Sequence, residues 1–449
     1  MSPLPFYFVT LTHPTWEAAV ACVRRLPAEA LPELRLDLFP EYDPAELVDA
    51  LARRCLVTCR RKTEGGCWEG TEAERLDHLL VALQARPAWI DLEWELDLTP
   101  EIIAHRSHTR LLRSVHVPKG VFDLETRLEN LPKGDAYKWV GHAEHLSDNA
   151  QLKPLLARCH DLGIPLSAFL MGPKGLPSRC LQGAWGGAFT YAAPDDGPAA
   201  APGQLPLSVM HGWRLHRLNP AFALCGVIGN PVLHSRGPAF HNARFQRNFK
   251  DLLYLPLECA TAEEANQAMA SLGILGLSIT APLKETLPVL LGLQGPLNTL
   301  WRRAPQEPWQ GANTDAEALA KALAALAKGP VLLLGDGGVA ATSRAVLEAH
   351  GFPCHQLSRR SADHDAAALQ PVGVIQATRL GMDEGDPLPF PEQLHTALPS
   401  LRWAVEWVYK TDTAFAAWAR EHNLQLIEGN TLFETQAEGQ SSRFVQGCG

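Results

Sequence analysis

Short apolar runs recur at regular intervals over about the first 190 residues of the chain, with more polar stretches between them. Eight short apolar runs have the length of buried strands: FYFVTLT, LPELRLDLF, CLVTCR, PAWIDLEW, HTRLLRSVH, DAYKWVG, IPLSAFLMG and GAFTYAA. Amphipathic stretches such as WEAAVACVRRL and AERLDHLLVAL separate most of them. Repeated strand and helix units predict a parallel sheet, and eight strands close into a (β/α)8 barrel. We predict this barrel over residues 1–215; because the segment is short for the fold, a trimmed or partly open barrel is the alternative.

The pattern changes after AAPDDGPAAAPGQ, a loop rich in Pro, Gly and Ala. The runs ALCGVIG, LLYLPLE and ILGLSIT lead to an Ala-rich helix, and PVLLLG, PCHQLS, PVGVIQAT and LRWAVEWVY form a further strand pattern. We predict an α/β substrate subdomain at 222–328 and a Rossmann nucleotide subdomain at 329–409. The last helical stretch, within 410–449, is expected to return to the substrate subdomain.

Composition narrows the class of ligand. The 449 residues are 46% hydrophobic and 20% charged, which is typical of a globular protein with about two to four domains. The net charge of −9 comes without a basic run, so neither nucleic acid nor an anionic membrane is expected as a partner. No apolar stretch approaches the roughly 18 residues of a membrane span. Small anionic molecules are the expected ligands.

Ten cysteines follow neither a CxxC spacing nor a paired zinc-finger spacing. We therefore expect reduced thiols and a cytoplasmic protein. Cys55, Cys59 and Cys67 lie close in sequence, but structural zinc sites usually hold their ligands in two closely spaced pairs. No metal site is predicted.

Lys138 lies among apolar and aromatic neighbours in the predicted strand DAYKWVG. Burial lowers the pKa of an ammonium group, and a neutral amine can attack a ketone to form a Schiff base. His116, at the end of the preceding strand, can act as the base. A single strand lysine is more often an edge residue, and a single histidine more often belongs to the core. The co-occurrence with the predicted strand-end arginines Arg35, Arg60 and Arg179 favours a site that binds a carboxylate or hydroxyls.

Six motifs, in order over about 200 residues, resemble type I 3-dehydroquinate dehydratase: ELRLD, TCRRKTEGG, SVH, YKWVG, MGPKGLPSR and APGQ. The resemblance implies that Lys138 forms an imine with the ketone of 3-dehydroquinate, that His116 removes the α-proton and helps water leave, and that Glu64 orients the histidine. The substrate-binding positions that it implies are Glu33, Arg35, Arg60, Arg179 and Gln204. Ala200 stands where the family has a substrate-contacting serine, and this loss is expected to weaken binding by about 0.5–1.5 kcal/mol.

The second half contains a lysine and an aspartate that can form a proton-transfer pair. Lys284 follows the strand in LSITAPLKETL, and Asp315 lies at the entry to a helix in QGANTDAEAL. Together they can move a proton onto a developing alkoxide. Alternatively, Thr314 or Asp315 is the N-cap of that helix.

A glycine-rich turn follows the strand PVLLLG. Gly335, Gly337 and Ala340 fit the pattern GxGxxA at the mouth of a helix, where backbone amides can hold a pyrophosphate. The next strand ends in LSRRSAD, and two arginines there favour the 2′-phosphate of NADP over the ribose of NAD. A solvated basic turn is the alternative. The residues predicted to contact the cofactor at these places are Gly335, Gly337, Gly338, Ala340, Ser358, Arg359 and Arg360.

Seven motifs over the remaining 225 or so residues resemble shikimate dehydrogenase: GVIGNPVLHS, ITAPLKE, GPLNTL, GANTD, the GDGG loop, QATRLGM and TLFETQA. The resemblance implies that Lys284 and Asp315 are the catalytic pair, and that the nicotinamide lies near Thr378 and Met382, with hydride transfer to the C3 ketone. The shikimate-binding positions that it implies are Ser235, Gly237, Thr280, Asn298 and Gln436.

Two positions depart from the dehydrogenase pattern. Gly237 replaces the second serine of the family motif, which is expected to open space near C1 of the substrate and to allow quinate, with its extra hydroxyl, to bind. Gln376 replaces an asparagine near the cofactor.

The sequence thus predicts a bifunctional enzyme that dehydrates 3-dehydroquinate and reduces the product to shikimate with NADPH. The alternatives are a dehydratase fused to a quinate-preferring dehydrogenase, and a non-catalytic sensor of these metabolites.

Overall fold

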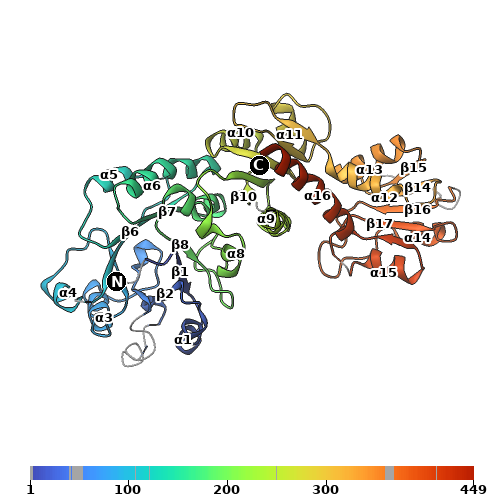
Figure 1. Ribbon diagram of the computed structural model, residues 1–449. Coiled ribbons are helices and arrows are strands. Elements are labelled where there is room, and N and C mark those ends of the chain that lie inside the picture. Colours follow the sequence, from blue (N-terminus) through green and yellow to red (C-terminus); the bar gives the residue numbers. More distant parts are fainter. Residues whose placement is uncertain are drawn as a thin grey trace. The chain divides into compact units, whose positions relative to one another are not determined.

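The computed structural model describes residues 4–39, 42, 54–106, 108–120, 122–248, 250–358, 369–410 and 412–448. The chain divides into two compact units, Met1–Leu275 and Gly276–Gly449 (Figure 1). Each unit is described by itself. In the described part of the chain, none of the helices combines the length and hydropathy that a transmembrane segment needs.

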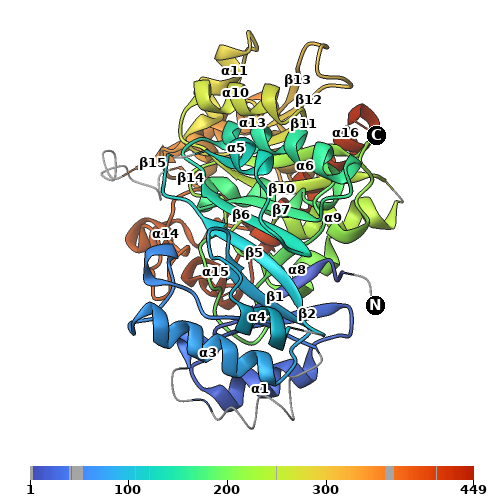
Figure 2. The ribbon, with the colours of Figure 1, turned by 90° about the vertical axis from the view of Figure 1, so that its left-hand side faces the viewer.

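A parallel sheet of eight strands dominates the first unit, and its order is β7-β6-β5-β4-β3-β2-β1-β8. Figure 2 labels five of these strands, β1, β2, β5, β6 and β7. The strands are β1 Tyr7–Leu11, β2 Ala30–Arg35, β3 Leu56–Thr58, β4 Trp89–Glu93, β5 Arg110–His116, β6 Ala136–His142, β7 Leu166–Met171 and β8 Thr190–Ala192. Each corresponds to one of the predicted apolar runs, so this part of the prediction is confirmed. No ladder joins the described strands β7 and β8; the amide of Ala188 donates to the carbonyl of Leu166 at 2.8 Å instead. The sheet is therefore a near-barrel, as expected for a short version of this fold.

Helices connect these strands, as repeated strand and helix units require. They are α1 Trp16–Arg25, α3 Glu72–Gln84, α4 Pro100–His105, α5 Leu124–Glu129, α6 Leu152–Asp161, α7 Leu176–Cys180 and α8 Leu207–Gly212. Local signals set their starts: the hydroxyl of Thr15 accepts from the amide of Ala18, and Thr71 and Glu74 form a capping box at α3.

The first unit continues with β9 Ala223–Gly229 and β10 Leu252–Glu258, which pair in parallel, and with α9 Gly237–Arg247 and α10 Ala262–Ser271. Both strands match predicted runs. The second unit begins within β11 Ile274–Ile279, which pairs antiparallel with β12 Thr299–Trp301, and β12 pairs antiparallel with β13 Gln310–Ala312. The sequence analysis missed β12 and β13, because three residues are too few to show a period.

Two helices of the second unit, α11 Leu283–Leu290 and α12 Thr314–Leu323, follow these strands, and the last helix, α16 Gly429–Cys448, packs against α12 and β12. The contact is polar as well as apolar: Ser278 donates to Gln440 at 2.9 Å, and Gln440 donates to Thr299 at 3.2 Å. The C-terminal helix therefore packs on elements of the predicted substrate subdomain.

A second parallel sheet follows, in the order β15-β14-β16-β17-β18. Its strands are β14 Val331–Leu334, β15 Cys354–Leu357, β16 Gly373–Gln376, β17 Trp403–Glu406 and β18 Gln425–Ile427, and its helices are α13 Gly338–Ala349, α14 Pro391–Ala397 and α15 Ala414–Glu421. Alternate residues of β14 enter different cores: Val331 and Leu333 pack with α12 and α13, whereas Leu332 and Leu334 pack with α14 and α15. Helices therefore cover both faces of the sheet, as a doubly wound fold requires (Figure 1).

Candidate active sites

The inner face of the near-barrel changes from apolar to polar along several of the strands. Side chains two residues apart face the same side of a strand; in β4, buried Trp89 is followed by Asp91 and Glu93, and in β6, Ala136 is followed by Lys138. The polar positions lie toward the carboxyl ends of the strands, where active sites of this fold are built. They surround a cavity of about 110 Å³ whose lining includes Thr10, Glu33, Arg35, Arg60, Glu64, His116, Lys138, Arg179, Tyr191, Ala200 and Gln204. All eight polar residues predicted for the first site line this one cavity.

Lys138 is buried inside the cavity wall, with 5% of its surface exposed. Its Nζ lies 3.8 Å from Oε1 of Glu33 and 3.9 Å from the ring centroid of Tyr191. Burial lowers the pKa of Lys138 to about 8; Glu33 opposes this shift, and the positive charge of Arg60 adds to it. At pH 7 roughly a tenth of the amine is therefore neutral, far more than at the ordinary lysine pKa, and the neutral amine is the nucleophile.

Glu33 is held as an acceptor beside this amine. Its carboxylate accepts hydrogen bonds from the hydroxyl of Thr10 at 2.6 Å and from that of Thr58 at 3.1 Å. Thr10 lies on β1 and Thr58 on β3, the two strands that flank β2 with Glu33. Sequence reasoning missed both threonines, although the two-residue period of FYFVTLT and CLVTCR contains the signal.

His116, the last residue of β5, faces the same cavity. Its Nδ1 lies 3.2 Å from Oε2 of Glu64, which also accepts from Nη1 of Arg60 at 3.3 Å. Burial lowers the pKa of His116 well below its usual value, and the cations Arg60 and Lys138 lower it further. The imidazole is therefore neutral, and Glu64 can fix its orientation and tautomer.

The three predicted arginines differ in their partners. Arg35 forms a bidentate pair with Asp37, at 2.8 and 2.5 Å, and Arg60 pairs with Asp91 and donates to the hydroxyl of Ser114 at 2.8 Å. Protein groups therefore already engage both guanidinium groups. Sequence reasoning missed Asp91 and Ser114, which take the inward positions of β4 and β5.

Arg179 is the arginine best able to receive an anion. Burial lowers the pKa of Arg179 to about 10 and no carboxylate offsets this; its Nε has no hydrogen-bond partner in the described part of the chain. The guanidinium lies over the ring of Phe169, 4.3 Å from the centroid. The prediction that Arg179 ends a strand is wrong, because a turn after β7 leads into the short helix α7, which carries this residue.

Gln204 belongs to the loop that follows β8. Its side-chain amide donates to the carbonyl of Ala192 at 3.0 Å and accepts from the amide of Ala200 at 2.8 Å. Ala200 thus supports Gln204 through its backbone. Its methyl side chain cannot supply the hydroxyl that the family's serine would bring to the cavity.

In the second unit, Lys284 and Asp315 are in contact. Nζ of Lys284 donates to Oδ2 of Asp315 at 3.0 Å, and the side chains are 37% and 11% exposed. Asn313 is the N-cap of α12 and accepts from the amide of Ala316 at 3.0 Å. The alternative that Thr314 or Asp315 caps this helix is therefore wrong, because the helix begins one residue earlier than that reading needs.

Asn298 and Gln436 converge on Thr314 in the same unit. The side-chain oxygen of Asn298 accepts from the amide of Thr314 at 2.8 Å, and that of Gln436 accepts from its hydroxyl at 3.3 Å. Both amide side chains are buried, and Thr280 directly follows β11. The contacts fix the orientations of two predicted shikimate-binding residues.

Ser235 and Gly237 lie in the first unit, where the amide of Gly237 donates to the hydroxyl of Ser235 at 3.1 Å. A Cβ at position 237 would lie 3.1 Å from Cε1 of Tyr254 and 3.2 Å from Oγ of Ser235. A Cβ at this position would therefore be in tight contact with the buried ring of Tyr254, and the expectation of open space near C1 of the substrate stays a prediction.

The turn between β14 and α13 has the backbone that a dinucleotide requires. Gly335 has φ +116°, and a Cβ there would lie 2.7 Å from the carbonyl oxygen of Ala377, so only glycine fits. Among the described residues, no atom lies within 4 Å of a Cβ at Gly337 or Gly338, at the N-terminus of the 12-residue helix α13. Buried Ala340 packs that helix onto the sheet. Open space before a helix N-terminus fits a pyrophosphate group.

The other predicted cofactor residues lie near this turn or outside the described residues. Gln376 accepts from the amide of Thr378 at 2.8 Å and donates to the carbonyl of Leu380 at 2.8 Å, so it shapes the turn that leads to the exposed Met382. Ser358 directly follows β15 and is buried. Arg359 and Arg360 lie outside the described residues.

Two family models match the chain. Residues 7–213 match type I 3-dehydroquinase, and residues 227–293 match the shikimate dehydrogenase substrate binding domain. The chain is thus similar to these two families over two separate segments. Solved shikimate dehydrogenases include complexes with NAD and with NADP+.

Curated relatives combine the two names. A "Bifunctional 3-dehydroquinate dehydratase/shikimate dehydrogenase, chloroplastic" from Arabidopsis thaliana is 29% identical over 307 residues, which cover 64% of this chain but only 50% of that one. The "Shikimate biosynthesis protein AroDE" from Chlamydia pneumoniae is 28% identical over 80% of this chain and 77% of its own. The solved dehydroquinate dehydratase and shikimate dehydrogenase of S. pombe AroM is 20% identical over 98% of this chain and 95% of its own, with a TM-score of 0.39.

Proposed function

We propose that this protein is a bifunctional enzyme that dehydrates 3-dehydroquinate to 3-dehydroshikimate and reduces that product to shikimate with NADPH. The observation that carries the proposal is the buried amine of Lys138, whose pKa is lowered to about 8 in a cavity that it shares with neutral His116. The second reaction consumes the product of the first. The domains proposed for these steps are residues 1–215, 222–328 completed by 410–449, and 329–409.

The dehydratase step begins at Lys138. Its neutral amine attacks the C3 ketone, and loss of water from the adduct gives a protonated imine, which withdraws electrons and acidifies the neighbouring C2–H. His116 takes that proton through its free Nε2 and then gives it to the departing C1 hydroxyl, which leaves as water. Hydrolysis of the imine releases 3-dehydroshikimate and restores Lys138. Glu64 is a positioning residue for the imidazole.

The remaining cavity residues bind substrate or hold other side chains. Arg179 has no competing carboxylate, so we assign it and Gln204 to the substrate carboxylate. Glu33 accepts hydrogen bonds from substrate hydroxyls and balances the charge of the iminium beside it. Arg35 and Arg60, which Asp37 and Asp91 already engage, complete the positive wall of the cavity.

The reductase step uses Lys284 and Asp315. Lys284 donates a proton to the oxygen that forms at C3 as the ketone is reduced, and Asp315 holds the ammonium group in place. Ser235, Thr280, Asn298 and Gln436 are assigned to shikimate. NADPH, when bound, supplies the hydride. The residues assigned to it are Gly335, Gly337, Gly338, Ala340, Ser358, Arg359, Arg360, Thr378 and Met382.

Mass spectrometry after borohydride treatment tests the first activity. With 3-dehydroquinate present, we expect one reduced adduct, confined to the peptide that contains Lys138. Lys138→Met should abolish the adduct, whereas Lys119→Met, at a lysine whose side chain is 70% exposed, should leave it unchanged. Absence of both adduct and turnover in the wild-type protein would reject the dehydratase and favour a sensor.

The cofactor assignment is tested by the ratio of kcat/KM for NADPH to that for NADH. We expect a preference for NADPH that falls at least about tenfold in the Arg359→Ala, Arg360→Ala double variant, because the loss of a charged hydrogen bond costs about 1.5–3 kcal/mol. A ratio that the double variant does not change would reject the arginine assignment.

Gly237 keeps quinate as a second candidate substrate of the reductase. The position of Tyr254 argues against it, because its buried ring lies close to position 237 on one side. We therefore expect kcat/KM for shikimate to exceed that for quinate. The reverse order would identify a quinate-preferring dehydrogenase.

A further inference from the structure

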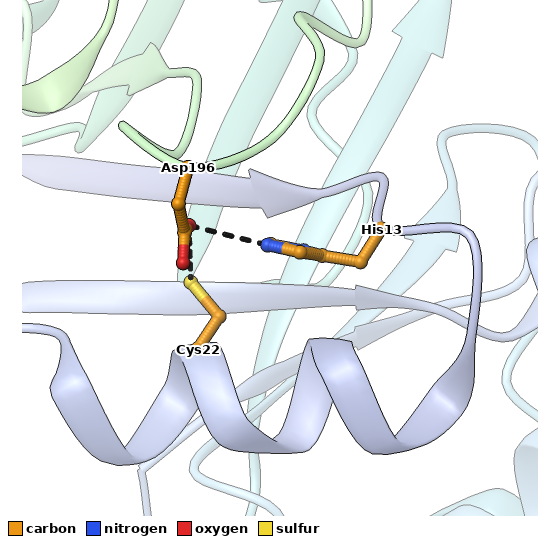
Figure 3. Close-up of side chains that lie close together, drawn as sticks. All are labelled: His13, Cys22 and Asp196. Atoms are coloured by element: carbon orange, nitrogen blue, oxygen red, sulfur yellow. Dashed lines mark hydrogen bonds and ion pairs between the residues drawn. The ribbon is translucent and has the colours of Figure 1, made fainter.

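Three potential metal ligands meet on one side of the near-barrel, outside the cavity described above. His13 follows β1, Cys22 lies on α1, and Asp196 lies on the loop after β8; Figure 3 shows the imidazole and the thiol both pointing at the carboxylate. Their ligand atoms all lie within 4.8 Å of one another. His13 and Cys22 are buried, whereas the side chain of Asp196 is 47% exposed, so an ion can enter from solvent.

Two of the three distances between these atoms match the edges of a tetrahedron around zinc, and the third, from the imidazole to the thiol, is within 4.8 Å. Bonds of about 2.0–2.1 Å to nitrogen or oxygen and about 2.3 Å to sulfur place tetrahedral ligand atoms roughly 3.3 Å (N to O) and roughly 3.5 Å (S to O) apart. Nε2 of His13 lies 3.2 Å, and Sγ of Cys22 lies 3.6 Å, from the same atom, Oδ1 of Asp196. An ion can therefore replace the two shared protons with little movement of the side chains.

The surroundings keep the three ligands in place. Arg25 donates to Oδ2 of Asp196, which leaves Oδ1 for an ion and fixes the carboxylate plane. A Cβ at Gly197 would lie 3.2 Å from both Cε1 and Nε2 of His13, so the loop backbone packs directly on the imidazole. The hydroxyl of Thr12 also donates to the carbonyl of Pro198. The site is thus formed before any ion arrives.

We propose that His13, Cys22 and Asp196 form a binding site for a thiophilic divalent cation, with zinc the favoured ion and a water molecule as its fourth ligand. A thiolate, an imidazole and one carboxylate select zinc or cobalt over magnesium or calcium, which prefer oxygen ligands. The ion would tie the loop after β8 to β1 and α1. The same loop carries Ala200 and Gln204, which line the dehydratase cavity. A bound ion would therefore influence the cavity only through the position of this loop and would take no part in catalysis.

Metal binding to the full-length, reduced protein tests this proposal independently of activity. We expect one equivalent of zinc to bind, with a Kd of roughly micromolar or below, in competition with a chromophoric chelator. The cobalt(II) form should show a thiolate-to-metal charge-transfer band and the intense visible bands of tetrahedral coordination. Cys22→Ser, His13→Gln and Asp196→Asn should each weaken binding by more than about 100-fold, because even residues that only orient a ligand contribute about 10–100-fold.

Cys67→Ser is the matched control, because Cys67 is an exposed thiol and the natural place for adventitious zinc. We expect this variant to bind like the wild type. Loss of binding in Cys67→Ser, a cobalt spectrum without the thiolate band, or unchanged binding in Cys22→Ser would each overturn the proposal. Hydrogen exchange of the wild type needs no variant: zinc should slow exchange of the amides at 195–204, and unchanged exchange would show that no ion holds the loop.

Discussion

At the scale of single residues, the first site depends on the buried amine of Lys138, because the fold disfavours its protonated form. A pKa lowered from 10.5 to about 8 corresponds to roughly 3 kcal/mol against the protonated form of Lys138. Because the pKa is lower in the folded state, the unfolded chain binds the proton more tightly between pH 8 and 10.5. The stability of the wild type therefore rises with pH across this window.

Lys138→Met tests this cost directly. Below pH 8 we expect the variant to be more stable than the wild type by up to about 3 kcal/mol, and we expect this difference to disappear above about pH 10.5. Dehydratase turnover should be lost at every pH. Calorimetric melting of both proteins across this pH range measures the effect, and a variant that melts lower than the wild type below pH 8 would contradict it.

His116→Gln separates the base from the nucleophile. We expect kcat of the dehydratase to fall by about 10²–10⁴-fold, the usual contribution of a general acid–base group. The imine on Lys138 should still form and be trapped by borohydride, because burial lowers the pKa of the amine without help from the imidazole. Steady-state kinetics and trapping on the same preparation check this. Loss of the trapped adduct would instead assign His116 to imine formation.

At the scale of elements, the turn from β14 into α13 uses glycine for two different reasons. At Gly335 a side chain collides with the carbonyl of Ala377, whereas at Gly338 the space is open to solvent and to a ligand. Backbone strain and ligand access can therefore be tested at neighbouring positions of one motif.

We expect Gly335→Ala to lower the melting temperature, at a cost of about 1–3 kcal/mol, because its φ of +116° and the close carbonyl leave no room for a methyl group. Gly338→Ala should keep or slightly raise the melting temperature while raising KM for NADPH at least about tenfold, since the methyl group would occupy the approach of the pyrophosphate. Thermal melting and NADPH titration distinguish the two. An unchanged KM in Gly338→Ala would remove this turn from the cofactor site.

At the scale of the whole molecule, the near-barrel is fixed to α10 of the same unit by one carboxylate. Glu264 accepts from Nζ of Lys174 at 2.7 Å and from the amide of Leu146 at 3.3 Å. Burial tends to raise the pKa of Glu264, but Lys174 and the amide outweigh it, so the pKa is lowered. This stabilisation is present above the unfolded-state pKa and is lost as pH falls through the folded-state value.

Glu264→Gln should cost about 1–3 kcal/mol near neutral pH, since it leaves Lys174 without its partner, and the difference from the wild type should shrink in acid. Because Lys174 begins the segment that leads to Arg179, we also expect a higher KM for 3-dehydroquinate. Glu263→Gln, at the exposed neighbouring position, is the control. Denaturant melts at two pH values measure the effect, and equal stabilities of the two variants would rule out this role for Glu264.

The sequence by itself determined most of the elements, although not the three-residue strands β12 and β13. Short apolar runs marked all eight strands of the near-barrel, and Lys138 and His116 could be placed on neighbouring strands because strand order followed chain order. The glycines of the β14 turn could be recognised for a similar reason: a backbone conformation that excludes Cβ restricts the residue type locally.

Only the tertiary structure decided which groups meet. The pairing of Arg60 with Asp91 and the lack of a partner at Nε of Arg179 depend on distances between side chains from different strands. The ring of Tyr254 beside Gly237 and the cap at Asn313 also required coordinates, because no single motif indicates either contact. A local pattern sets the direction of a side chain, but its pKa and its partners come from atoms that are distant in sequence and close in space.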